Sequence, residues 1–449
     1  MRKSLLPFIA LALAASAAAE VKQRTANNGN LVMEDVPEIP AQIVADLNRY
    51  QNVRAAAVRA WSADGSSLYV STRFGDVSNL HRVDMPGGAR HQVTFFDEPI
   101  GQVARQPGAA MLTFTRDAGG SEFAQIFMLD PDGGDARMLT DGESRNGGVV
   151  WDREGRGFAY QSTARNGASN DIWLMDPEAP GDKRIVLESP DGTLWAPTEF
   201  SKSGSKVLVA NYVSVTDARA HLLDLDTGDV TLLAGGGDDP SFNIPLAFDD
   251  DNDGFWLITD RAGEFNTLAW QAMEPGAEPE YVTADIPWNI EGAALSDDRS
   301  RMVFTANEGG RSVLYLLDPA AREYRAVDGI PVGLVGGLEF SPDGTQLAMT
   351  INTAKSPSDT FVLELGAGPL DYGRLERWTF SEVGGLDTST FREPELIEFP
   401  TFDEVDGSPR QIPAWLYKPA GDGPFPVVIS IHGGPEGQIR WRNLRIMEL

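Results

Sequence analysis

The chain has 449 residues, with 46 glycines, 29 prolines, no cysteine and a formal net charge of -29. Its length allows about two or three domains. Its 42% hydrophobic and 23% charged residues are typical of a folded globular protein. The absence of cysteine excludes disulfides, thiolate metal sites and cysteine nucleophiles. The 66 acidic against 37 basic residues repel phosphate and so disfavour nucleic acid as a partner.

Residues 1–19 have the pattern of a secretory signal peptide. Arg2 and Lys3 precede an apolar run from Leu5 to Ala15, and three alanines ending at Ala19 form a cleavage site. The apolar run is shorter than the roughly 20 residues that a membrane-spanning helix needs, which disfavours the alternative of an uncleaved anchor. We therefore expect an exported protein, periplasmic or extracellular, with no membrane span after cleavage.

Residues 20–52 form a polar lead-in with one expected short helix. Pro40 suits the first turn of a helix, and Ile43, Val44, Leu47 and Tyr50 follow at helical spacing.

From about Val53 to Thr379 one unit of four short strands recurs seven times. Its clearest copy is LEFSPDGTQLAMTI at 338–351, in which a Ser-Pro-Asp-Gly turn joins two apolar strands. Each copy continues with a third strand, a hairpin and a fourth strand. The turn positions recur every 43 to 50 residues at Gly65, Gly108, Gly155, Gly204, Gly254, Ser300 and Gly344. Glycine suits such turns because it adopts positive φ without steric cost.

This repeat predicts an all-β fold, a seven-bladed β-propeller. Four-strand sheets at this period bury both faces only when they are stacked around an axis. A solenoid would need shorter and more uniform repeats, and a two-sheet sandwich would not explain seven copies. Because the first and seventh copies each already hold four strands, we expect the ring to close by side-chain packing alone, without strand exchange.

Asp249, Asp251, Asp253 and Asp260 match part of a calcium-loop pattern. The pattern's last position is usually glutamate, and this segment occupies the turn that every copy has. An acidic surface turn is therefore the favoured interpretation over a calcium site, and no cofactor is expected.

The tryptophans and histidines have ordinary interpretations that we favour. Trp61, Trp151, Trp173 and Trp256 lie on strand positions, where packing between blades is favoured over ligand stacking. His81, His91 and His221 are scattered, with no second ligand at metal spacing. The acidic excess indicates a solvated exterior, or else a preference for cationic ligands that the sequence does not localise.

After Thr379 the repeats cease. Residues 396–438 read as two strands joined by a turn, followed by an apolar strand, Val427–Ile431, that runs into His432-Gly433-Gly434-Pro435-Glu436. A buried strand ending in a His-Gly-Gly loop is typical of the α/β-hydrolase oxyanion hole, where backbone N–H groups face the developing charge.

The repeats followed by AWLYKP and PFPVVISIHGGPEGQ resemble the prolyl oligopeptidase family of serine peptidases, in its acylaminoacyl- and dipeptidyl-peptidase-like branch. The lead-in segments GNLVMEDVPEIP and LNRYQN are similar to that family as well, so the resemblance covers residues 29 to 438. It implies proteolysis of short peptides by serine, aspartate and histidine residues, with the propeller screening which substrates enter.

The resemblance carries over only Gly433 and Gly434, as oxyanion-loop candidates. No G-x-S-x-G motif occurs in the 449 residues, and His432, the last histidine, belongs to the loop. No catalytic residue is therefore assigned, and we expect the chain itself to be inactive. The competing hypothesis is a non-catalytic periplasmic propeller that binds protein partners.

The expected domains are the signal peptide (1–19), the lead-in (20–52), the propeller (53–380) and the start of a truncated hydrolase domain (381–449). Arg440, Arg442 and Arg445 fall close together in so acidic a chain, and residues 439–449 depart from the family pattern. We hypothesise a truncated or frameshifted reading of a longer gene.

Overall fold

The computed structural model describes residues 21–441 except 239, 406 and 435–436, and the expected signal peptide lies outside this range. The chain divides into two compact units, residues 1–48 and 49–449. In the first unit, β1 (Gln23–Ala26) and β2 (Leu31–Glu34) form an antiparallel hairpin around the 3-10 turn Asn27–Gly29. The expected short helix is α1 (Ala41–Gln51), and the division between the units falls within it, after Asn48. Within the described range, no helix combines the length and apolar character needed to cross a membrane.

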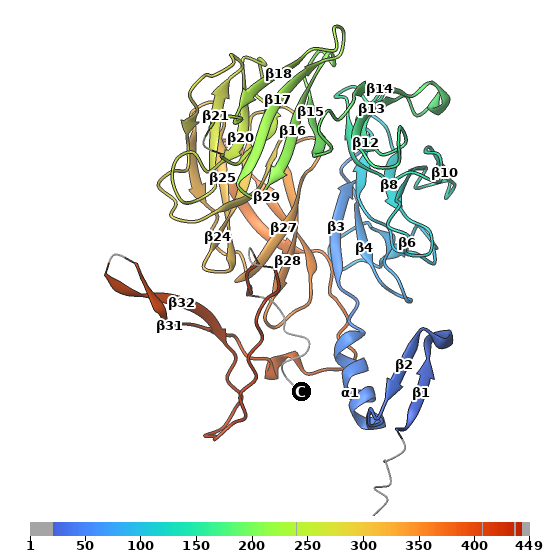
Figure 1. Cartoon of the computed structure of the whole chain (residues 1–449), viewed down its shortest axis with the longest axis vertical. Coiled ribbons are helices and arrows are strands. Elements are labelled where there is room, and N and C mark those ends of the chain that lie inside the picture. The colour runs from blue at the N-terminus through green and yellow to red at the C-terminus, as the bar shows by residue number, and fades with distance from the viewer. Residues whose placement is uncertain (1–20, 239, 406, 435–436, 442–449) are drawn as a thin grey trace, which may run out of the picture. The chain divides into compact units, whose positions relative to one another are not determined.

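The second unit contains seven four-stranded antiparallel sheets, which confirms the predicted seven-bladed propeller (Figure 1). In every sheet the strands pair in sequence order. The first two blades are β3 (Ala56–Trp61), β4 (Leu68–Thr72), β5 (Asn79–Val83) and β6 (His91–Gln92), then β7 (Val103–Arg105), β8 (Leu112–Arg116), β9 (Gln125–Leu129) and β10 (Ala136–Met138).

The third and fourth blades are β11 (Asn146–Trp151), β12 (Phe158–Ser162), β13 (Asp171–Met175) and β14 (Arg184–Leu187), then β15 (Leu194–Phe200), β16 (Lys206–Ser214), β17 (Asp217–Asp224) and β18 (Val230–Ala234). A 3-10 turn, Pro180–Asp182, precedes β14.

The last three blades are β19 (Asn243–Phe248), β20 (Gly254–Thr259), β21 (Thr267–Ala272) and β22 (Glu280–Tyr281), then β23 (Ile290–Leu295), β24 (Met302–Glu308), β25 (Arg311–Asp318) and β26 (Glu323–Ala326), and finally β27 (Gly333–Phe340), β28 (Gln346–Thr353), β29 (Asp359–Leu365) and β30 (Tyr372–Arg377).

In three blades a serine and an aspartate stabilise the turn between the first two strands. In the first blade, Ser62 Oγ donates to Asp64 Oδ1 at 2.7 Å and accepts from the Ser67 N–H at 2.9 Å, while Gly65 has φ +70. These hydrogen bonds lower the pKa of Asp64 to about 2. The same arrangement recurs at Ser296 with Asp298 and at Ser341 with Asp343.

Two turns differ from the sequence prediction. In the fifth blade the positive φ falls on Asn252 (+59), and Gly254 instead opens β20, where a Cβ would lie 2.3 Å from the Trp270 ring. In the sixth blade Arg299 (φ +61), not Ser300, occupies the left-handed position. Asparagine tolerates positive φ better than most residues do. Arginine is sterically strained in this conformation, whereas glycine would not be.

Within a blade, a threonine that follows the fourth strand forms hydrogen bonds with the start of the third strand. In the first blade the Leu80 N–H donates to Thr94 Oγ1 at 2.9 Å, and Thr94 Oγ1 donates to Asn79 Oδ1 at 2.9 Å. Equivalent bonds link Thr140 to Gln125 and Thr379 to Asp359. They satisfy polar groups that become buried where blades pack together.

Hydrophobic clusters fill the spaces between successive blades. Trp61 and Trp256 are 1% exposed and Trp151 is 8% exposed, in three separate clusters, which supports the packing interpretation of these tryptophans. The innermost strands alternate buried and partly exposed residues, as in β3 and β19. Packing between blades therefore buries these tryptophans together with their apolar neighbours.

The ring closes between the first and seventh blades without strand exchange, as predicted. Trp61 meets Trp378 edge to face, with ring centroids 5.9 Å apart. The expectation of side-chain packing alone was wrong, because the Ala56 N–H donates to the Ser358 carbonyl at 2.9 Å and the Val58 N–H to Thr350 Oγ1 at 2.9 Å. We call this junction the seam.

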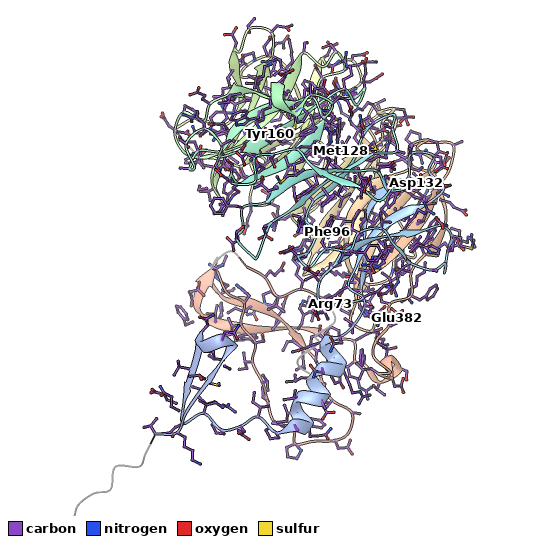
Figure 2. All side chains as sticks on the ribbon, turned by 90° about the vertical axis from the view of Figure 1, so that its right-hand side faces the viewer. Arg73, Phe96, Met128, Asp132, Tyr160 and Glu382 are labelled. Atoms are coloured by element: carbon purple, nitrogen blue, oxygen red, sulfur yellow. The ribbon has the colours of Figure 1, made fainter. Side chains whose placement is uncertain are left out.

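The segment after β30 extends the seam. The Arg54 N–H donates to the Glu382 carbonyl at 3.0 Å, and the Arg90 guanidinium pairs with the Glu382 carboxylate. Arg73, labelled with Glu382 in Figure 2, donates to the Gln51 carbonyl at 2.7 Å. The chain is therefore fastened to the first blade both where it enters the propeller and where it leaves it.

The region beyond the propeller begins with a 3-10 turn, Thr388–Thr390, and the predicted strand pair is present as β31 (Glu395–Val405) and β32 (Ser408–Leu416). The predicted strand Val427–Ile431 is wrong for this structure. These residues have no assigned secondary structure, and Val427 and Ile431 are each 83% exposed. A strand requires a hydrogen-bonded neighbour, and none of the described residues pairs with this segment.

Replacing the seam tryptophan tests how much ring closure contributes to stability. Trp378→Ala removes a 7%-exposed ring from the cluster that joins the first and last blades. We expect the free energy of unfolding to fall by about 3–5 kcal/mol, measured by urea denaturation. The matched control is Trp288→Ala, at a position that is 38% exposed, with an expected loss of about 1 kcal/mol or less. Equal effects of the two substitutions would refute a special role for the seam.

Candidate functional site

The two predicted oxyanion-loop glycines lie on an open part of the chain. Gly433 and Gly434 are exposed, and a Cβ built on either meets no atom within 4 Å. Gly434 has φ +67, which favours glycine, and its carbonyl accepts the Gly437 N–H at 3.1 Å. The loop therefore leaves room for a close approach by a ligand, and its oxyanion role stays a prediction.

The segment that follows this loop lies against the sixth blade. Asn307 Nδ2 donates to Gln438 Oε1 at 2.7 Å, and the Trp441 N–H donates to the Gly310 carbonyl at 2.8 Å. Arg440 Nη1 also donates to Glu291 Oε2 at 2.6 Å. These contacts lie near the start of β23 and in the β24–β25 hairpin, at one end of the ring axis.

The calcium-loop candidates are not gathered around one point. Asp249 precedes β20 and accepts from Trp270 Nε1 at 3.1 Å, whereas Asp260 follows β20 and accepts from the Phe242 N–H at 2.8 Å. Six residues of strand separate them by roughly 20 Å. No group of three or more His, Asp or Glu residues in the described part of the chain is placed to hold a metal.

The histidines of the propeller are in packing or surface positions. His81 is fully buried, with Nδ1 3.0 Å from the Asn79 carbonyl. His221 packs against Trp195, with ring centroids 4.8 Å apart, and burial lowers its pKa to about 4. His91 is exposed. A buried neutral imidazole with such a depressed pKa suits packing rather than proton transfer at neutral pH.

At the other end of the ring axis, charged residues from non-adjacent blades meet. The innermost strands all run in the same direction, so residues at their ends come together around the axis. Arg105 ends β7 in the second blade, and Asp297 follows β23 in the sixth, yet Arg105 Nη2 lies 3.5 Å from Asp297 Oδ2. Two residues of non-adjacent blades come this close only by reaching across the axis.

A second group crosses the ring nearby. Glu199, one residue before the end of β15, accepts from Arg299 Nη2 of the sixth blade at 2.5 Å and from the Phe248 N–H of the fifth at 2.6 Å. Arg153 of the third blade lies with Nη2 3.6 Å from the same carboxylate. We call the residues Arg105, Arg153, Glu199, Asp297, Arg299 and Glu339 the axial cluster.

Glu339 is the seventh blade's contribution to the axial cluster. It occupies the position equivalent to Glu199, and its side chain is solvent accessible although protein surrounds it, as on a channel wall. Burial raises its pKa to about 7, while Arg105 acts to lower the pKa and Asp297 to raise it. This carboxyl therefore changes charge near neutral pH.

Sequence reasoning missed the axial cluster because its members are spread over more than 200 residues and form no motif. One signal was present. The repeats read TEFSKSG at 198–204 and LEFSPDG at 338–344, so an acidic residue precedes Phe-Ser in two blades only. Aligning the repeats would have marked Glu199 and Glu339 as exceptions at an otherwise apolar position.

The raised pKa of Glu339 predicts a pH-dependent stability. Between the ordinary glutamate pKa of about 4.5 and about 7, the folded state binds a proton that the unfolded state lacks, so stability falls as pH rises through this window. Glu339→Gln removes the effect. We expect the melting temperatures of the variant and the wild type to agree near pH 4 and the variant to melt higher above pH 7.

Scanning fluorimetry from pH 4 to 8 checks this, with Glu178→Gln, an exposed loop position, as the control that should follow the wild type throughout. A pH profile of Glu339→Gln that parallels the wild type would contradict the assignment.

Comparisons with known proteins agree with this architecture. The sequence matches no family model. Over 426 residues it is 21% identical to a Bacillus subtilis (strain 168) protein named uncharacterized peptidase YuxL, covering 84% of this chain and 56% of that protein. It is 33% identical over 115 residues to uncharacterized protein Atu1656 of Agrobacterium fabrum, covering 24% of this chain and 38% of that protein.

Solved structures of prolyl peptidases share the fold. A prolyl endopeptidase superimposes with a TM-score of 0.65 at 13% identity, covering 89% of this chain and 64% of that one. Prolyl oligopeptidase B from Galerina marginata gives a TM-score of 0.64 at 12% identity, with 88% and 63% covered. The chain thus spans about 56–64% of the lengths of these long matches. It has the fold of the propeller portion of the prolyl oligopeptidase family, as the sequence resemblance predicted.

Proposed function

We propose that this chain is the substrate-screening propeller of an exported serine-type peptidase of the prolyl oligopeptidase family that acts on short peptides. The observation that carries the proposal is the seven-bladed ring whose axis is spanned at one end by ion pairs between non-adjacent blades. The long match to a named bacterial peptidase supports the same class.

The axial cluster gives a physical reason for restricting substrates to short peptides. The Arg105–Asp297 pair and the Glu199–Arg299 pair place side chains across the axis, so a folded polypeptide meets charged groups there instead of an open passage. A short peptide in an extended conformation is narrow enough to pass beside these side chains, whereas a folded polypeptide is not. Size selection then follows from packing and charge, with no need for a specific recognition sequence.

The Gly433–Gly434 loop is the part of the chemistry that this chain supplies. Backbone N–H groups of such a loop stabilise the negative charge of a tetrahedral intermediate when an acyl group is attacked. The 449 residues hold no G-x-S-x-G motif to supply the nucleophile, and His432 belongs to the loop itself. Because oxyanion contacts cannot replace an absent nucleophile and base, the 449-residue chain is itself inactive.

Export is a further part of the proposal. It rests on the basic start at Arg2 and Lys3, the apolar run from Leu5 to Ala15 and the alanine-rich cleavage site ending at Ala19. An N-terminus that still begins at Met1 on secreted protein would refute the cleavage.

The competing function is a non-catalytic propeller that binds protein partners in the periplasm. The seven-bladed ring by itself is compatible with this function, whereas the strand pair β31–β32 and the His-Gly-Gly-Pro segment have no role in it.

Hydrolysis of aminoacyl-chromogenic peptides separates the two functions. The 449-residue chain is assayed beside the product of the same gene read beyond residue 449. We expect no turnover by the chain and clear turnover by the longer product, because only the latter can supply a nucleophile. Turnover by the 449-residue chain would refute its inactivity. Absence of turnover by both proteins would favour the partner-binding function.

A further inference from the structure

One arginine on the innermost strand of the first blade has no polar partner. Arg59 makes no hydrogen bond, ion pair or ring contact with any residue that the structure describes, and its Nε is buried without an acceptor. Burial alone lowers the pKa of its guanidinium, and no neighbouring charge contributes to this shift. Arginine is rarely withdrawn from water unless it is paired. The described residues therefore do not compensate the partial desolvation of this cation.

The backbone of β3 explains why the Arg59 side chain leaves the sheet. β3 pairs with β4 along one edge, so its other edge faces the ring axis. The register of this pair shifts between Val58 and Ala60, which makes Arg59 the extra residue of a β-bulge. The side chain is partly exposed, and Nη1 and Nη2, unlike Nε, retain accessible surface. These two terminal nitrogens are therefore available to a molecule inside the ring.

The walls around Arg59 are open and uncharged. The seventh blade, which adjoins the first at the seam, contributes the exposed glycines Gly336 and Gly337, and a Cβ built on Gly336 meets no atom within 4 Å. In a ring of seven, the fourth and fifth blades lie opposite the first, and their bulge residues are Thr198 and Leu246. None of these residues carries a charge that could pair with Arg59. Open space and an unpaired cation therefore occur together.

The sixth blade shows that a segment from outside the blades can reach a charged bulge residue. The register of β23 on β24 shifts between Ile290 and Gly292, which makes Glu291 the extra residue of its strand. Arg440, which lies beyond the propeller, donates from Nη1 to Glu291 Oε2 at 2.6 Å. Arg59 offers the opposite charge at the bulge of the first blade.

We propose that Arg59 binds the carboxylate of a peptide inside the ring, either a free C-terminus or an acidic side chain, and makes the propeller selective for peptides that carry one. The planar guanidinium presents paired N–H donors that match the two oxygens of a carboxylate. Partial burial strengthens this interaction, because water screens it less than at the surface. No carboxylate of the described residues competes for Arg59.

This site rests on the proposed screening function, in which peptides enter the ring. Its test measures binding and needs no hydrolysis, so the two proposals fail in different ways. Peptide binding through Arg59 would support the site even if the longer gene product showed no turnover. Turnover by that product, without any effect of Arg59 on peptide binding, would overturn the site and leave the peptidase function.

Titration calorimetry at constant ionic strength compares N-acetyl-trialanine, which has a free C-terminus, with its C-terminal amide. We expect the wild-type chain to bind the acid at least about tenfold more tightly than the amide, because hydrogen bonds between charged groups are among the stronger ones. Arg59→Gln should abolish this preference and leave binding of the amide unchanged. The matched control is Arg374→Gln on the outermost strand β30, where a 64%-exposed arginine pairs with Glu376. This control should keep the preference.

Thermal unfolding separates a binding role from a structural one. Because Arg59 has no partner among the described residues, Arg59→Gln should melt at the wild-type temperature or above it. Arg59→Lys keeps the charge but loses the paired donors, so it should retain only part of the preference for the acid. Equal binding of acid and amide by the wild type, or an unchanged preference in folded Arg59→Gln, would overturn the proposal.

A third peptide identifies the source of the carboxylate. N-acetyl-Ala-Glu-Ala amide carries a carboxylate on its side chain only. If it binds more tightly than the trialanine amide and loses this advantage in Arg59→Gln, the site accepts acidic side chains. If only the peptide with a free C-terminus binds in this way, the site recognises peptide termini. Binding of acetate without binding of either acidic peptide would overturn the assignment to peptides.

Discussion

The structure depends on the seam between the first and seventh blades. Each blade is a four-stranded sheet that exposes apolar faces unless a neighbour covers them, and only the closed ring covers all of them. Trp61, Trp378 and the bonds from the Ala56 and Val58 amides make that closure without exchanging a strand. Hydrogen bonds from these backbone amides therefore supply part of the stabilisation that a blade built from both ends of the chain would give.

Closure also creates the axial cluster. Charged side chains at the ends of the inner strands lie far apart along the sequence, and the ring brings Arg105 to Asp297 and Glu199 to Arg299. In an open arc these groups would be solvated separately, each at little cost. In the ring they lie close together, and the protein around them raises the pKa of Glu339 and leaves arginine donors without acceptors. The proposed screening of substrates is a consequence of this closeness.

The sequence predicted what is periodic and local. Four-strand repeats, Ser-Asp turns and the β31–β32 pair follow from hydrophobic alternation and turn chemistry, and each is present. It could not predict which residue of a divergent turn takes positive φ, as at Asn252 and Arg299, because neighbouring packing decides this. The apolar character of Val427–Ile431 also predicted a strand there. That prediction was wrong because a strand needs a hydrogen-bonded neighbour. The axial cluster could not be predicted, because its residues come close to one another only in the closed ring and not within any one segment.

A distance measured across the ring tests the central claim, that closure brings non-adjacent blades together. Because the chain has no native cysteine, spin labels attach selectively to a variant carrying Ala110→Cys and Ser300→Cys, exposed turn positions of the second and sixth blades. Double electron–electron resonance should give one short, narrow distance distribution, and Trp378→Ala should broaden it. A broad distribution of long distances in the otherwise wild-type chain would contradict a closed ring and everything inferred from its axis.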